Sequence, residues 1–168
     1  MNANILPNTL SFEGVLDEEV TLDQLLVYLG QLKSSGLTPP VNLDFSKVSY
    51  ANSTGIVTWL KFTREAKLCF KYVNAPVWLV NQFNMVKGYF EFGSFVESMH
   101  VPYFAPKTQD SRVFNLTVGK DFPLLADYSN VTIPNRKADG RDYEIDFTPE
   151  RYLSFISENL PNFKEKLK

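Results

Sequence analysis

Residues 43–55 read LDFSKVSYANSTG, an apolar strand pattern that ends in the small polar residues Asn52, Ser53 and Thr54 and in Gly55. The alternation of apolar side chains begins at Val41 and is typical of a strand with one buried face. Directly after Gly55 the chain resumes as IVTWLKF, in which apolar residues recur at helical spacing. The stretch therefore predicts a strand, a short polar loop and a helix in immediate succession.

The segments on both sides of this stretch repeat the alternation of strand and helix. Residues 9–16 have the pattern of a strand, and residues 21–36 that of a helix that begins with Thr21 and Gln24 at the spacing of a capping box. A further strand is expected at 70–73, and a third helix from Pro76 to near Gly88. This order predicts an α/β fold in which helices pack on a largely parallel sheet.

The helix that follows the polar loop is expected over residues 55–70. It contains the only cysteine, Cys69, which is therefore expected in the core. A single cysteine excludes an internal disulfide framework and a cysteine-rich metal site, and it suits a reducing compartment.

The pattern changes after Ser98, where the regular alternation of strands and helices stops. Strand-like pieces at 111–119 and 141–147 are separated by loops that contain prolines. A final helix is expected at 148–160, with Thr148 as its cap and Pro149 in the first helical position. The chain is therefore divided into an α/β domain over residues 1–98 and a β-rich annex with a terminal helix over residues 99–168.

The composition narrows the class of partner. The chain has 168 residues, of which 44% are hydrophobic, and a formal net charge of −2. Such a balance creates no field that would attract nucleic acid or anionic lipid, so any partner must be recognised by local shape. The N-terminal residues have no secretion signal, and no apolar run approaches the ~20 residues of a membrane span. We therefore expect a cytoplasmic protein without membrane insertion.

The inventory of reactive side chains argues against an enzyme. The only histidine is His100 and the only cysteine is Cys69, so no Ser–His or Cys–His pair has an evident base and orienting group. No glycine-rich phosphate loop follows a strand. The sequence predicts no catalytic residue, no cofactor and no metal. The acidic residues 17–19 are expected to form a solvated turn.

The polar loop itself has two readings from its residues. Asn52 or Ser53 can cap the helix that follows, and small polar residues are what any helix start prefers. A helix N-terminus also stabilises a negative charge, so the same loop could accept an anion or a phosphate group. The residues alone leave the alternatives of simple cap and working site open.

Three segments taken together resemble the STAS domain, the module of anti-sigma factor antagonists and of sulfate-transporter tails. Residues Gly14 to Asp17 match the family's G-x-L-D turn, and Asp44 to Gly55 match its D-x-S-x-V-x-x-x-D-S-S/T-G strand and loop. Asn74 to Pro76, with Val80, match the segment that starts its third helix. The resemblance covers residues 8–98 and implies a mixed sheet backed by helices.

The resemblance also implies a role in protein–protein switching. In antagonist members the first serine of the loop accepts a phosphate from a partner kinase; that position is Ser53, and Thr54 matches the second hydroxyl. The acidic position of the motif is Asn52 in this chain. The partner-binding surface implied by the resemblance comprises six residues: Asp17, Asp44, Asn52, Ser53, Thr54 and Gly55.

The annex resembles a zinc ribbon that has lost its cysteines. The four ligand positions are occupied by Ala105, Thr108, Asn135 and Ala138, whose side chains cannot form a tetrahedral zinc site. The function expected for the whole chain is that of a non-enzymatic regulatory protein of the anti-sigma factor antagonist type. The alternative is a constitutive structural or scaffold subunit of a complex without a phosphorylation switch, and self-association is left open.

Overall fold

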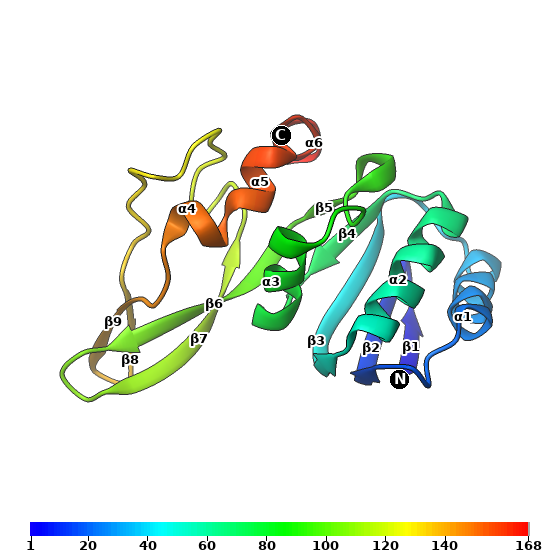
Figure 1. Ribbon diagram of the computed structural model, residues 1–168, viewed down its shortest axis with the longest axis horizontal. Helices are drawn as coiled ribbons and strands as arrows, with labels where there is room; N and C mark the ends of the chain where they lie inside the picture. The colour runs from blue at the N-terminus through cyan, green and yellow to red at the C-terminus, as the bar shows by residue number, and fades with distance from the viewer. Residues whose placement is uncertain (168) are drawn as a thin grey trace.

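Two β-sheets of different kinds follow one another along the chain in the computed structural model, which describes residues 1–167 (Figure 1). The first sheet has the order β1-β2-β3-β4-β5, with β1 antiparallel to β2 and every other pair parallel. Its strands are β1 (Asn2–Leu6), β2 (Thr9–Leu16), β3 (Val41–Ala51), β4 (Phe70–Val73) and β5 (Phe95–Val96). The expected α/β class with a mixed sheet is confirmed.

Three helices, α1 (Leu22–Ser34), α2 (Ser53–Ala66) and α3 (Val77–Met85), pack on one face of this sheet. The contact is largely aromatic: Trp59 of α2 meets Phe45 of β3 edge to face, with ring centroids 4.8 Å apart. The other face of the sheet carries partly exposed polar side chains, such as Asn42 and Asp44 of β3. The strand alternation read from the sequence therefore separates a buried face from a polar one.

The cap of α1 and the N-terminal strand differ from the sequence prediction. Thr21 Oγ1 accepts a hydrogen bond from the Gln24 backbone N–H at 3.2 Å, but the Gln24 side chain donates to the Met1 carbonyl and the Tyr28 hydroxyl, so the capping box is half formed. β1 was not predicted. Pairing with β2 places its alternate side chains over α1, a long-range contact that its five residues do not reveal on their own.

The predicted extent of the second helix, residues 55–70, was wrong at its C-terminal end. α2 ends at Ala66 because Lys67 adopts the left-handed conformation, with φ 51°. Cys69 therefore lies outside the helix and is only half-buried, and its thiol donates to the Gly93 carbonyl at 3.2 Å. The chain must leave the helix here to enter β4.

The second sheet is antiparallel, with the order β7-β6-β9-β8. Its strands are β6 (Ser98–Ala105), β7 (Asp110–Thr117), β8 (Arg136–Ala138) and β9 (Arg141–Ile145). Strands were expected at the positions of β7 and β9, whereas β6, which contains Pro102, was not. β6 also contacts the segment that follows β4, because the His100 N–H donates to the Ala75 carbonyl at 2.8 Å in an isolated parallel bridge between Ala75 and Met99.

The single terminal helix predicted at 148–160 is replaced by three short ones, α4 (Pro149–Tyr152), α5 (Ser154–Glu158) and α6 (Leu160–Lys166). Asn84 of α3 explains the first break. Its side-chain Oδ1 accepts hydrogen bonds from the Phe155 N–H at 3.0 Å and the Ser154 hydroxyl at 2.7 Å, and its Nδ2 donates to the Tyr152 carbonyl. Thr148 makes no capping hydrogen bond with its side chain.

These C-terminal helices complete the core of the first part of the chain. The Phe155 ring lies 5.4 Å from that of Phe83 and stacks on that of Phe90 at 5.7 Å. Phe163 also contacts Phe90, at 5.7 Å, close to the short 3-10 helix at Glu91–Gly93. The last residues of the chain therefore pack against residues about seventy positions earlier (Figure 1).

Candidate functional site

The polar loop lies where β3 ends and α2 begins, at the carboxyl end of the parallel strands (Figure 1). Asn52 is the cap of α2: its Oδ1 accepts a hydrogen bond from the Gly55 N–H at 2.9 Å. The Asn52 N–H donates to the Leu16 carbonyl at 3.1 Å. The loop is thus fixed both to its own helix and to the end of β2.

Gly55 is buried where the first turn of α2 lies directly on the end of β2. A Cβ atom at this position would lie 2.1 Å from the Leu16 carbonyl oxygen and 2.8 Å from the Asp17 nitrogen. Its backbone is not in the left-handed region, so the requirement is for space. Glycine here is explained by the close approach of two backbones.

Ser53 and Thr54 are both exposed in the first turn of α2. Within residues 1–167, neither hydroxyl has a hydrogen-bond partner. A negative charge at this end of a helix gains about 0.3–1 kcal/mol from the helix dipole. The two hydroxyls are therefore accessible to a modifying enzyme, and the helix tolerates a charge on either of them.

The acidic turn before α1 belongs to the same surface. Asp17 Oδ1 accepts a hydrogen bond from the Glu19 N–H at 3.2 Å, which shapes the turn. The Asn52 amide donates to the Glu18 carboxylate. The backbone N–H of Glu18 first, and the Asn52 amide second, hold the pKa of Glu18 below its ordinary value. Asp17 was expected at this site from the sequence, whereas Glu18, whose pairing with Asn52 spans 34 positions, was not.

Asp44 lies apart from the loop. It pairs with Val73 at the end of β4, and β3 continues for seven residues beyond it to Ala51. At about 3.3 Å per residue that corresponds to roughly 23 Å of strand. The structure thus brings together Asp17, Asn52, Ser53, Thr54 and Gly55 but not Asp44, whose charge acts instead on His100.

His100 gives a direct test of that placement. Burial lowers the pKa of His100 from its ordinary value of 6.5, and the Asp44 carboxylate partly opposes the shift. Replacing Asp44 with asparagine should therefore lower the pKa further. The unfolded chain binds this proton more readily than the folded protein does. His100 should therefore leave the stability of the protein unchanged above pH 6.5 and lower it as the pH falls below 6.5. NMR titration of the single imidazole measures the pKa, and a rise in the Asp44→Asn variant would contradict the placement.

A groove runs beside the loop, between α2 and α3. It has a volume of about 280 Å³ and is lined by Tyr50, Ala51, Asn52, Ser53, Ile56, Val57, Leu60, Gln82 and Val86. Two apolar side chains on it face solvent, with Tyr50 56% and Val57 51% exposed. The groove brings an apolar surface next to Ser53, and it could not be predicted from the sequence because α3 supplies one of its walls.

The four positions that would hold zinc in a ribbon lie at the turns of the second sheet. Ala105 and Thr108 bound the β6–β7 turn, where the Thr108 N–H donates to the Ala105 carbonyl at 3.2 Å. Asn135 directly precedes β8 and Ala138 is the last residue of that strand, and a small cavity is shared by Asn135 and the β6–β7 turn. Within residues 1–167 there is no group of three or more His, Cys, Asp and Glu side chains placed to hold a metal ion.

Comparison with known proteins does not identify a relative. No protein-family model matches the chain, and neither the curated proteins nor the solved structures gave a match. In the part of the chain that the structure describes, no helix combines the length and the apolar character needed to cross a bilayer.

Proposed function

We propose that this chain is a non-enzymatic regulatory protein, similar to an anti-sigma factor antagonist, that binds a partner protein through the Asn52–Gly55 loop and the adjoining groove. The observation that carries the proposal is the position of Ser53. Ser53 is exposed and lines a groove whose Tyr50 and Val57 side chains are more than half exposed. Exposed tyrosine beside an apolar groove is typical of a protein interface.

The arrangement around the loop also supports regulation at this point. The cap, Gly55 and the Leu16 carbonyl hold the first turn of α2 rigidly, so a change on Ser53 alters the surface rather than the fold. Transfer of a phosphoryl group from a nucleoside triphosphate on a partner kinase would form an Oγ–P bond and release the diphosphate and the hydroxyl proton. The product adds about −1.5 to −2 charges next to the groove.

Glu18 supplies a carboxylate beside the loop, and this bears on which kinase could recognise Ser53. The Asn52 amide holds its carboxylate beside the loop, in a chain that lacks the acidic residue of the motif at position 52. A kinase that reads a carboxylate next to its target serine could use Glu18 in that role. Phosphate on Ser53 would then create a strongly anionic surface that excludes a partner whose own surface is apolar or acidic.

The alternative function is a constitutive subunit of a larger complex. It is favoured by the finding that Asn52 and Gly55 each have a complete structural explanation, as cap and as space for the Leu16 carbonyl. The two functions differ in the effect of a charge on Ser53, because only a switch requires that partner binding respond to it.

The Ser53→Asp variant should lower the affinity for the partner at least tenfold, or by about 1.4 kcal/mol. Its free energy of unfolding should change by less than about 0.5 kcal/mol, because an acidic residue suits the first turn of a helix. Partners captured from a native extract by the purified wild-type chain and the variant would be quantified by mass spectrometry, and the affinity of the recovered partner measured.

Ser111→Asp provides the matched control, since Ser111 is exposed on β7 in the second sheet. Tyr50→Ala tests the groove without touching the serine, and it should also weaken binding. If Ser53→Asp binds like the wild-type chain while Tyr50→Ala does not, the constitutive function is correct. If neither variant changes the affinity for the partner, the partner does not bind at this surface.

A further inference from the structure

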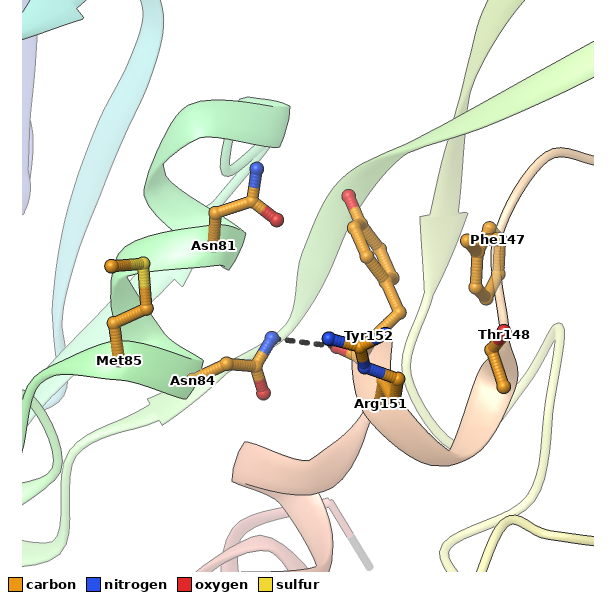
Figure 2. Close-up of a pocket in the computed structure, with 7 residues that line it drawn as sticks. All are labelled: Asn81, Asn84, Met85, Phe147, Thr148, Arg151 and Tyr152. Atoms are coloured by element: carbon orange, nitrogen blue, oxygen red, sulfur yellow. Dashed lines mark hydrogen bonds between the residues drawn. The ribbon is translucent and has the colours of Figure 1, made fainter.

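A second concave site lies between α3 and the segment that leads into α4, separate from the Asn52–Gly55 loop (Figure 2). It is widely open to solvent and has a volume of about 390 Å³, within the range of roughly 300–1,000 Å³ typical of small-molecule sites. Figure 2 shows side chains of α3 on one side of the cavity and those of residues 147–152 on the other. The principal lining side chains are Asn81, Met85, Phe147, Thr148, Arg151 and Tyr152.

The framework of this cavity is held in place before any ligand binds. Asn84 also lines the cavity. Its amide nitrogen donates to the Tyr152 carbonyl, and its amide oxygen accepts from the Ser154 hydroxyl and the Phe155 N–H. The Tyr152 hydroxyl donates to the His100 carbonyl at 2.8 Å, and its ring packs on that of Phe147 with centroids 4.5 Å apart. The aromatic wall is therefore preorganised.

Three polar side chains of the cavity remain free for a ligand. Within residues 1–167, no hydrogen bond or ion pair engages the Asn81 amide, the Thr148 hydroxyl or the Arg151 guanidinium. None of the lining residues carries a carboxylate, so the charge of Arg151 is not neutralised in the cavity. Met85 adds an apolar surface that is 75% exposed.

We propose that this cavity binds a small organic carboxylate that carries an apolar group. The guanidinium of Arg151 matches a carboxylate with two parallel hydrogen bonds, and Asn81 and Thr148 supply further donors. The apolar group packs against Met85 and the rings of Phe147 and Tyr152. A single cation balances a monoanion, whereas a phosphate dianion would be left half neutralised, which is why a carboxylate is favoured.

Isothermal titration calorimetry of the full chain with phenylacetate tests the proposal. Phenylacetamide, which is neutral, and inorganic phosphate are titrated in the same way for comparison with phenylacetate. Wild-type protein should bind phenylacetate at least tenfold more tightly than either, because a hydrogen bond to a charged group is worth more than one between neutral groups. The Arg151→Gln variant should lose at least tenfold in phenylacetate affinity, and Met85→Ala should lose a smaller factor.

Arg64→Gln is the matched control, because Arg64 is an exposed arginine on α2 that does not line this cavity. The affinity of the Arg64→Gln variant for phenylacetate should stay within twofold of the wild-type value. NMR shift changes on titration should centre on α3 and residues 147–152, which separates binding from a folding defect. The proposal is overturned if wild-type protein does not bind phenylacetate at millimolar concentration, if the amide or phosphate binds equally well, or if Arg151→Gln binds unchanged.

Discussion

The Gly55→Ala variant is expected to lose about 3 kcal/mol of stability, the upper end of what overpacking costs in a close-packed interior. The added Cβ would lie 2.1 Å from the Leu16 carbonyl oxygen, and the nearest atoms all belong to backbone that cannot rotate away. α2 would have to move off β2, and Trp59 on its buried face would move with it. Urea denaturation followed by tryptophan fluorescence measures the loss.

The chain offers a matched control for this substitution. Gly30 lies inside α1 with nothing within 4 Å of its would-be Cβ. Gly30→Ala should therefore stabilise the protein by about 0.5–1 kcal/mol, the ordinary helix preference for alanine over glycine. Equal effects of the two substitutions would show that helix propensity, and not the contact with β2, decides the role of Gly55.

The Phe155→Ala variant should lose about 3–5 kcal/mol, the usual cost of removing a buried aromatic ring from a core. Phe155 is 1% exposed and contacts Phe83 and Phe90, which belong to the first part of the chain. Both tryptophans, Trp59 and Trp78, also lie in that part. Their fluorescence should therefore report the destabilisation, although the substitution is in the C-terminal segment.

The measurement compares tryptophan fluorescence with far-ultraviolet circular dichroism during the same denaturation. A shared core requires that both signals shift to lower denaturant together. Val113→Ala is the control on the second sheet, since this side chain is 51% exposed and its loss should cost less than about 0.5 kcal/mol. A fluorescence midpoint unchanged by Phe155→Ala would mean that the first sheet is stable without the C-terminal helices.

Much of the first sheet could be predicted from the sequence because its signals are local. The period of apolar residues located β2, β3, β4 and three helices, and Thr21 does cap α1. Two of the errors occurred where a distant contact decides the conformation. β1 depends on its pairing with β2, and the break between α4 and α5 depends on the side chain of Asn84.

The candidate site also combines features that the sequence predicts with features that only the fold decides. Capping by Asn52 and the exposure of Ser53 and Thr54 follow from the loop's own residues and its place before a helix. The residues that surround the loop in space cannot be read from the loop itself. Glu18 reaches it from another turn, Asp44 lies farther back along β3 despite belonging to the same motif, and the groove needs α3 for one of its walls.

By itself the sequence determined that a strand, a cap and a helix succeed one another at LDFSKVSYANSTG, because backbone preference, side-chain period and capping act over a few residues. Only the tertiary structure decided that Gly55 must be glycine, since the Leu16 carbonyl occupies the space of a side chain. It also decided which surfaces lie beside Ser53 and Arg151, because packing joins residues that are remote along the chain.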